Sequence, residues 1–340
     1  MHYEIYDNSK YGKSIALLTA ISVLSGFFCC IIGEVMLPLA IAFLAALFTF
    51  ERDKRVMSVI TSLILLSFSI FFSVLFGVIY LYGFEIIIPS AIIAYYFRGK
   101  RGKGEAAFFV TAIITALSVA SLYFSAVAQI GDNSLVAVVD FYKSFFSELE
   151  EQFVASLTSY SVQTGTGVQE ALVNKETAVL LFSELINLVF SFLVIASFAI
   201  AGFSFKIYSS IVGKYSKNPD EIYRWRFSVT SVVSCFYCVV AVVSLFTSDT
   251  VSVFSVSVNN LNAIFSFVFA YLGFNFVFYL LSRKRSTAFA LIALIAALLF
   301  LNTLAIDILS FVGVFFSLVI NKATGGMSGG FGDDKRDSDK

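Results

Sequence analysis

The feature that most constrains this chain is a series of long apolar runs joined by loops that alternate in their content of basic residues. Crossing about 30 Å of hydrocarbon takes roughly 20 residues of helix. The apolar segments lie at 14–32, 35–50, 56–77, 78–97, 105–128, 178–205, 227–247, 256–281, 286–303 and 304–321. This pattern predicts an all-α polytopic membrane protein with about ten transmembrane helices, eight being the lower bound.

The composition indicates the same class. Hydrophobic residues make up 59% of the 340 residues and charged residues only 14%, whereas soluble domains are roughly 45–50% apolar and about 25% charged. The formal net charge is zero, so no global basic field points to nucleic acid. We therefore expect the lipid bilayer to be the main partner and expect no binding of nucleic acid.

The basic residues predict the topology. Lys and Arg cluster before the first span and after every second span, at 52–55, 98–103, 206–226 and 283–285. Cytoplasmic loops of membrane proteins carry an excess of Lys and Arg, so we expect these loops and both termini on the cytoplasmic side of a bacterial plasma membrane. The short, proline-containing stretch 78–97 must then be a span, because the basic loops on its two sides would otherwise lie on opposite faces.

This topology divides the chain into four predicted parts. The loop at 129–177 contains seven acidic residues and two lysines, which predicts an extracellular position, and its segment DFYKSFFSELEEQFVASL has the aromatic spacing of an amphipathic helix. The C-terminus is glycine-rich and then charged, which predicts a disordered cytoplasmic tail. The parts are an N-terminal five-span block at 1–128, the acidic loop at 129–177, a C-terminal five-span block at 178–322 and the tail at 323–340.

The sequence contains none of the residue patterns that usually indicate a catalytic site or a bound cofactor. The only histidine is His2, which argues against a His-based metal site or a Ser-His-Asp triad. Cys235 and Cys238 have redox spacing but lie within an apolar run, where cysteine behaves as a small buried hydrophobe. No Walker loop or H-E-x-x-H helix occurs. We expect no enzymatic activity, no cofactor and no metal site.

Four acidic residues, Glu34, Glu85, Glu184 and Asp307, lie within or at the edge of apolar runs. Ionisable side chains in a membrane are costly and usually face a cavity or a partner, so they are candidate site residues. Glu184 and Asn187 lie on one helix face because they are three residues apart. Without a basic partner, Glu184 is expected to be protonated and hydrogen-bonded or to pair with a bound cation.

We therefore predict an outward-facing ligand site formed by Glu184, Asn187, Glu85 and Asp307. The alternative for each acid is an interfacial or structural role at a helix end, and for Glu34, in a short turn, this is the main interpretation. Small residues on the first span, Ala16 and Ala20, have the spacing that lets helix backbones approach closely.

Several segments resemble those of the YybS-like family of predicted bacterial membrane proteins, a domain of unknown function numbered 2232. These segments are EVMLPLAIAFLAALF in the N-terminal block, RWRF before the seventh span, NNLNAIFSFVFAYLGFNFVFYLLSRKR and LAIDILSFVGVFFSLVINK. The N-terminal spans are similar to the substrate-binding subunits of energy-coupling-factor uptake systems. The resemblance implies that Ala16 and Ala20 dock a transport partner.

These observations predict a small-molecule-binding subunit of an uptake system. An acidic mouth favours a cationic or zwitterionic solute, and a chain without an ATPase motif needs separate energising subunits. One alternative is a non-transporting scaffold or regulatory membrane protein. Another is a self-contained secondary transporter. Such carriers have interrupted helices in corresponding positions of their two halves, but here Pro38 and Pro89 both interrupt spans of the first half.

Overall fold

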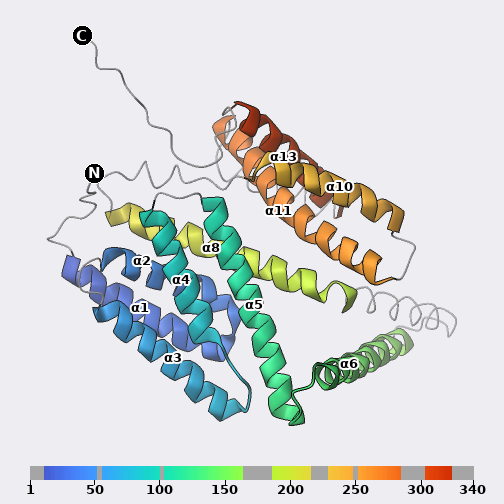
Figure 1. Ribbon diagram of the computed structural model, residues 1–340, viewed down its shortest axis with the longest axis horizontal. Coiled ribbons are helices and arrows are strands. Elements are labelled where there is room, and N and C mark those ends of the chain that lie inside the picture. Colours follow the sequence, from blue (N-terminus) through green and yellow to red (C-terminus); the bar gives the residue numbers. More distant parts are fainter. Residues whose placement is uncertain are drawn as a thin grey trace.

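The computed structural model describes residues 11–51, 56–99, 103–163, 186–215, 229–247, 252–284 and 303–323. Its regular elements in these ranges are all helical, which confirms the all-α prediction (Figure 1). They are α1 (Tyr11–Ile32), η2 (Glu34–Met36), α2 (Leu37–Phe50), α3 (Val56–Phe76), α4 (Tyr82–Arg98), α5 (Lys103–Ile130), α6 (Leu135–Gln163), α8 (Val189–Tyr215), α10 (Ser231–Thr247), α11 (Val253–Lys284) and α13 (Thr303–Ala323).

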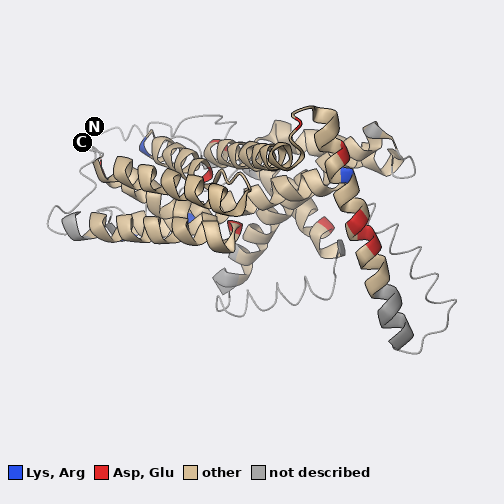
Figure 2. Cartoon of the chain, turned by 90° about the horizontal axis from the view of Figure 1, so that it is seen from below, with Lys and Arg blue, Asp and Glu red and all other residues tan. Residues whose placement is uncertain are grey.

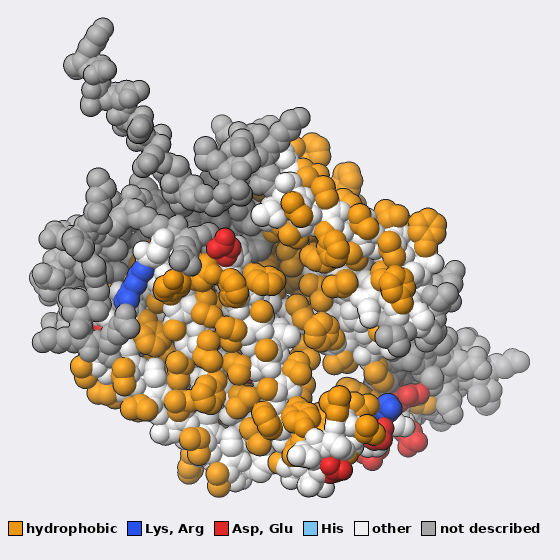
Figure 3. Space-filling view, viewed as in Figure 1, with side chains coloured by type: hydrophobic (Ala, Val, Ile, Leu, Met, Phe, Trp, Pro, Cys, Tyr) orange, Lys and Arg blue, Asp and Glu red, His pale blue; other side chains and the backbone are white. Residues whose placement is uncertain are grey.

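Within the described ranges, five helices are long and apolar enough to cross a membrane: Ser14–Ile32, Val56–Phe76, Gly104–Ile130, Val189–Lys214 and Phe254–Phe278. Shorter apolar helices lie at Glu34–Phe50, Ser231–Thr247 and Leu304–Val319. Large apolar side chains cover much of the visible surface, with charged groups near its edges (Figure 3). The predicted span at 286–303, the start of the span at 178–205 and the tail after 323 lie outside the described residues.

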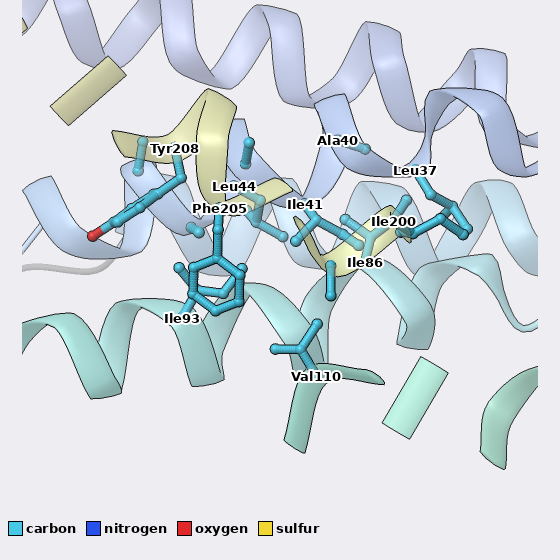
Figure 4. Close-up of a cluster of buried hydrophobic side chains, with 14 of the residues drawn as sticks. Leu37, Ala40, Ile41, Leu44, Ile86, Ile93, Val110, Ile200, Phe205 and Tyr208 are labelled. Atoms are coloured by element: carbon cyan, nitrogen blue, oxygen red, sulfur yellow. The ribbon is translucent and has the colours of Figure 1, made fainter. Parts of the chain in front are cut away.

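The N-terminal core surrounds α2. Ten of the 14 residues of α2 are buried, four of them alanines that let neighbouring helices approach closely. Leu37, Ile41 and Leu44 meet residues of α4, α5 and α8 in one apolar cluster (Figure 4). The buried Phe205 and Tyr208 come from α8. This helix therefore completes the N-terminal core, although the sequence placed it in the C-terminal block.

The C-terminal ends of α2, α4 and α8 meet at one end of this bundle. Arg98 donates hydrogen bonds to the carbonyl oxygens of Phe48 and Thr49, and the hydroxyls of Thr49 and Tyr208 lie 2.9 Å apart. The ends of α2 and α4 therefore lie side by side, and the C-terminal half of α8 packs against them.

A buried carboxylate joins the end of α2 to the start of α3. Glu51 follows the last residue of α2 and is 7% exposed. Its two oxygens accept hydrogen bonds from the backbone N–H groups of Met57 and Ser58, at 3.1 and 2.6 Å, and from the Ser58 hydroxyl at 2.6 Å. These are first-turn donors of α3 without a partner in their own helix, so Glu51 is an N-terminal cap for α3.

A second, smaller core joins α10, α11 and α13 through Tyr237, Phe269, Leu272 and Val314. Helices α11 and α13 run parallel, with the rings of Phe276 and Phe316 tilted by 32° at a centroid separation of 4.3 Å. Hydroxyl pairs also join α10 to this pair of helices, among them Ser234 of α10 with Ser317 of α13 at 2.8 Å. Parallel neighbours are expected if one further span connects them.

The acidic segment 129–177 contains α6, which projects from the two cores and carries most of its charged residues on exposed positions (Figure 2). Tyr142 attaches α6 to α5 by donating a hydrogen bond to the Leu122 carbonyl at 2.8 Å. Burial raises the pKa of Tyr142, so the hydroxyl remains a protonated donor at neutral pH.

Candidate functional site

The most unusual side chain in the N-terminal core is the carboxylate of Glu85, which lies in the first turn of α4 and is only 2% exposed. Its Oε1 accepts a hydrogen bond from the Ser118 hydroxyl of α5 at 3.3 Å. Its Oε2 has no hydrogen-bond partner among the residues that the structure describes. A buried charge without full pairing is strongly unfavourable, so a carboxyl in this position either holds a proton or pairs with a further group.

Pro89 lies inside α4, one turn after Glu85. Proline has no backbone N–H, so it cannot donate the usual helical hydrogen bond to the carbonyl of Glu85, four residues earlier. Ser90, the next residue, donates from its hydroxyl to the carbonyls of Ile86 and Ile41, at 2.6 and 2.9 Å. The second of these bonds joins α4 to α2 and holds this part of α4 in position.

The turn between α1 and α2 lies against the start of α4. Gly33 has a φ of +87°, which glycine adopts without strain, and its N–H closes the last turn of α1 on the Cys29 carbonyl at 2.9 Å. A side chain at Gly33 would lie 3.8 Å from the Tyr82 hydroxyl. Glu34, the first residue of η2, follows Gly33 in this turn and is exposed.

Among the described residues, no basic side chain forms an ion pair with Glu85 or with Glu34. The one ion pair between described residues is Lys143 with Asp140 on α6. No group of three or more His, Cys, Asp or Glu residues suited to a metal ion occurs in the described ranges. This arrangement of oxygen acceptors is suited to binding a positively charged group or to holding a proton.

The other predicted ligand-binding residues are placed differently. Asn187 is exposed, and it is its backbone carbonyl that accepts a hydrogen bond, from the Asn260 amide of α11 at 2.7 Å. Asp307 is exposed on α13, which packs against α10 and α11. Glu184 lies outside the described residues. The structure thus buries Glu85 in the N-terminal core and places Asp307 on a helix of the second core.

The predicted docking residues lie on the outer side of α1. Ala16 and Ala20 are both exposed, and so are Leu17 and Leu24. This face of α1 is turned away from the N-terminal core, where either lipid or a partner helix could cover it.

Sequence reasoning missed Ser118, although a signal was present. Ser118, Ser121 and Ser125 recur at the three- and four-residue spacing that places them on one face of α5. Ser121 donates to the Ile79 carbonyl at 2.6 Å, and Ser125 accepts from the Ile79 N–H at 3.2 Å. This polar face holds the α3–α4 connection and supplies the one described hydrogen bond to Glu85.

A helical bundle with several helices long and apolar enough to cross a membrane is typical of a polytopic membrane protein. The family model described as "Predicted membrane protein (DUF2232)" matches residues 17–315. The chain belongs to this family, and the match extends from α1 into α13. Comparison with curated proteins and with solved structures found no match in either set.

Proposed function

We propose that this protein is a small-molecule-binding subunit of an uptake system, with its ligand site at Glu85. The observation that supports the proposal is the buried Glu85 carboxylate, whose Oε2 has no partner among the described residues. In a stable apolar core such a group is usually replaced or paired. A bound solute would supply the missing partner.

The charge of the site sets the class of solute. Glu85 is buried, and it forms no ion pair with a basic side chain among the described residues. A carboxylate attracts a cation and repels an anion. The proposed solute is therefore cationic or zwitterionic.

The proposal includes separate energising subunits, because the chain has no ATPase motif, and no enzymatic activity of its own. Docking through Ala16 and Ala20 agrees with their exposure on α1 and with the closeness that small residues allow between helices. Similar docking faces occur in the substrate-binding subunits of energy-coupling-factor systems, which the N-terminal spans resemble.

The proposed topology has about ten spans in the plasma membrane, both termini in the cytoplasm and the Glu85 site open to the outside. Cysteine labelling on a Cys-free background tests it. A cysteine at Glu150 should react with an impermeant maleimide from outside intact cells, and a cysteine at Arg101 should react only after permeabilisation. Outside labelling at 101, or its failure at 150, contradicts the topology.

Glu85→Gln tests the site itself. The variant keeps the shape of the side chain and removes its charge, so we expect the affinity for a cationic or zwitterionic solute to fall at least tenfold, about 1.4 kcal/mol. Thermal unfolding of the ligand-free protein should not move to lower temperature, because an unpaired buried charge has been removed. The measurement is ligand-induced stabilisation across a panel of amines and amino acids.

Asp307→Asn is the matched control, because Asp307 is an exposed carboxylate in the second core, and it should leave the affinity unchanged. Glu184→Gln, in the same assay, tests whether the sixth span contributes to binding. Unaltered binding by Glu85→Gln, or no stabilisation of the wild-type protein by any member of the panel, counts against the proposed function.

A further inference from the structure

The turn between α5 and α6 fixes where α6 begins. Gly131 follows the last residue of α5 and has a φ of +75°, which glycine adopts without strain. The Asn133 carbonyl then accepts a hydrogen bond from the Tyr123 hydroxyl of α5 at 2.7 Å. The Ser134 hydroxyl accepts from the Ala137 N–H at 3.2 Å and caps α6. The start of α6 is therefore held beside the end of α5, and α6 leads away across the direction of α5 (Figure 1, Figure 2).

The hydrogen bond from Tyr142 sets the level of α6 along α5. The Tyr142 hydroxyl donates to the carbonyl of Leu122, which lies eight residues before Ile130, the last residue of α5. Eight residues of helix rise about 12 Å. The candidate span Gly104–Ile130 has 27 residues, a length of about 40 Å against a hydrocarbon core of about 30 Å. A span centred in the bilayer places Leu122 below the hydrocarbon surface, so α6 lies at the lipid boundary and not in bulk water.

One side of α6 is a row of apolar residues. The row has spacings of three, four and seven residues, which place its members on one side of a helix: Leu135, Val139, Phe146, Leu149 and Phe153. Tyr142 belongs to the same row, so this side is turned toward α5. Leu135, Val139 and Phe153 are nevertheless exposed. The contact with α5 thus leaves part of the apolar row uncovered.

The opposite side of α6 is acidic. Asp140, Glu148 and Glu151 are exposed there, with Ser144 between them (Figure 2). Carboxylates require water, whereas the apolar row is stabilised by leaving it. A helix with these two sides is accommodated in the plane of a membrane surface, where each side meets the surroundings that suit it.

Lipid is the cover that the neighbouring helix indicates. Leu122 and Phe124, near the contact with α6, are exposed on the apolar span of α5. The apolar row of α6 continues this lipid-facing surface at the level where the acyl chains begin. Helix α6 has four acidic residues and one basic residue, Lys143, so burial of the apolar row, rather than attraction to anionic headgroups, would hold it there.

We propose that α6 is an interfacial helix that binds the surface of the bilayer in which α5 is embedded. Leu135, Val139 and Phe153 enter the boundary between headgroups and acyl chains, to a depth of about 5–10 Å, and the acidic side stays in water. This inference is independent of the solute site, because no residue near Glu85 takes part in it.

The test measures the depth of single labelled cysteines in the full-length protein, with the native cysteines replaced by serine and the protein reconstituted in phosphatidylcholine vesicles. An environment-sensitive fluorophore is attached in Phe153→Cys and, as the matched control on the acidic side, in Ser144→Cys. A lipid with a nitroxide near the top of its acyl chain should quench the label at 153 at least about twofold more than the label at 144. Aqueous iodide on both sides of the membrane should quench in the opposite order.

Val139→Cys carries the label at a second position of the apolar row, so the test does not depend on retaining Phe153. Equal quenching by iodide on both sides of the helix, without quenching by the lipid, would overturn the inference and place α6 in water. Protection from both quenchers at 139 and 153 would also overturn it. Oxidative cross-linking between copies of unlabelled Phe153→Cys would then identify a second copy as the cover, and its absence another segment of this chain. None of these results bears on the proposed function, which depends on solute binding at Glu85.

Discussion

Gly313→Ala should destabilise the protein by about 1–3 kcal/mol, because α11 and α13 cross with their backbones in contact. A Cβ atom at Gly313 would overlap the carbonyl oxygen of Phe269, and one at Gly273 would overlap that of Leu309. Both obstacles are backbone atoms, which cannot rotate away as a flexible side chain does. The two helices must therefore separate, and Phe269, fully buried in the second core, loses packing.

The measurement is the shift of the unfolding transition of the purified protein in mild detergent. Gly202→Ala is the matched control: Gly202 lies within α8 and a Cβ there meets no atom within 4 Å. This control should be neutral or stabilising by up to about 1 kcal/mol, since alanine has the higher helix propensity. Equal behaviour of the two variants would show that α11 and α13 do not make this close crossing.

Asn260→Leu should cost about 2–3 kcal/mol, because the buried amide of Asn260 joins α11 to α8. Its Oδ1 accepts hydrogen bonds from the backbone N–H and the hydroxyl of Ser191, at 3.1 and 2.6 Å. Its Nδ2 donates to the carbonyls of Asn187 and Val256, at 2.7 and 2.8 Å. Leucine has a similar volume but satisfies none of these groups.

The expected readout is faster hydrogen exchange at residues 186–192 together with a lower unfolding midpoint. The Ser191 N–H lies in the first turn of α8, where backbone donors have no partner within the helix, so exchange there reports the loss directly. Asn275→Ala provides the control, because Asn275 is exposed and its amide donates to Tyr271 of its own helix. If exchange at 186–192 is the same in both variants, Asn260 does not cap α8.

Glu85 is the part of the candidate site that could be predicted from the sequence. An acid in an apolar run is expensive in lipid, and this cost alone singles it out. Its hydrogen-bond partner could not be predicted, since Ser118 is 33 residues away in the sequence and is one of many serines in the spans. Asn187 shows the converse: its spacing from Glu184 suggested a shared face, but the contact that the structure describes uses its backbone carbonyl.

The sequence by itself determined the class of protein and the positions of most helices, because the length and apolarity of a membrane helix are local properties. The run 14–32, for example, corresponds to α1. Only the tertiary structure decided which helices are neighbours. Hydropathy does not distinguish one apolar face from another, so the placement of α8 in the N-terminal core, with Tyr208 against Thr49, did not follow from local pattern. The contact of Glu85 with Ser118 of α5 did not follow from it either.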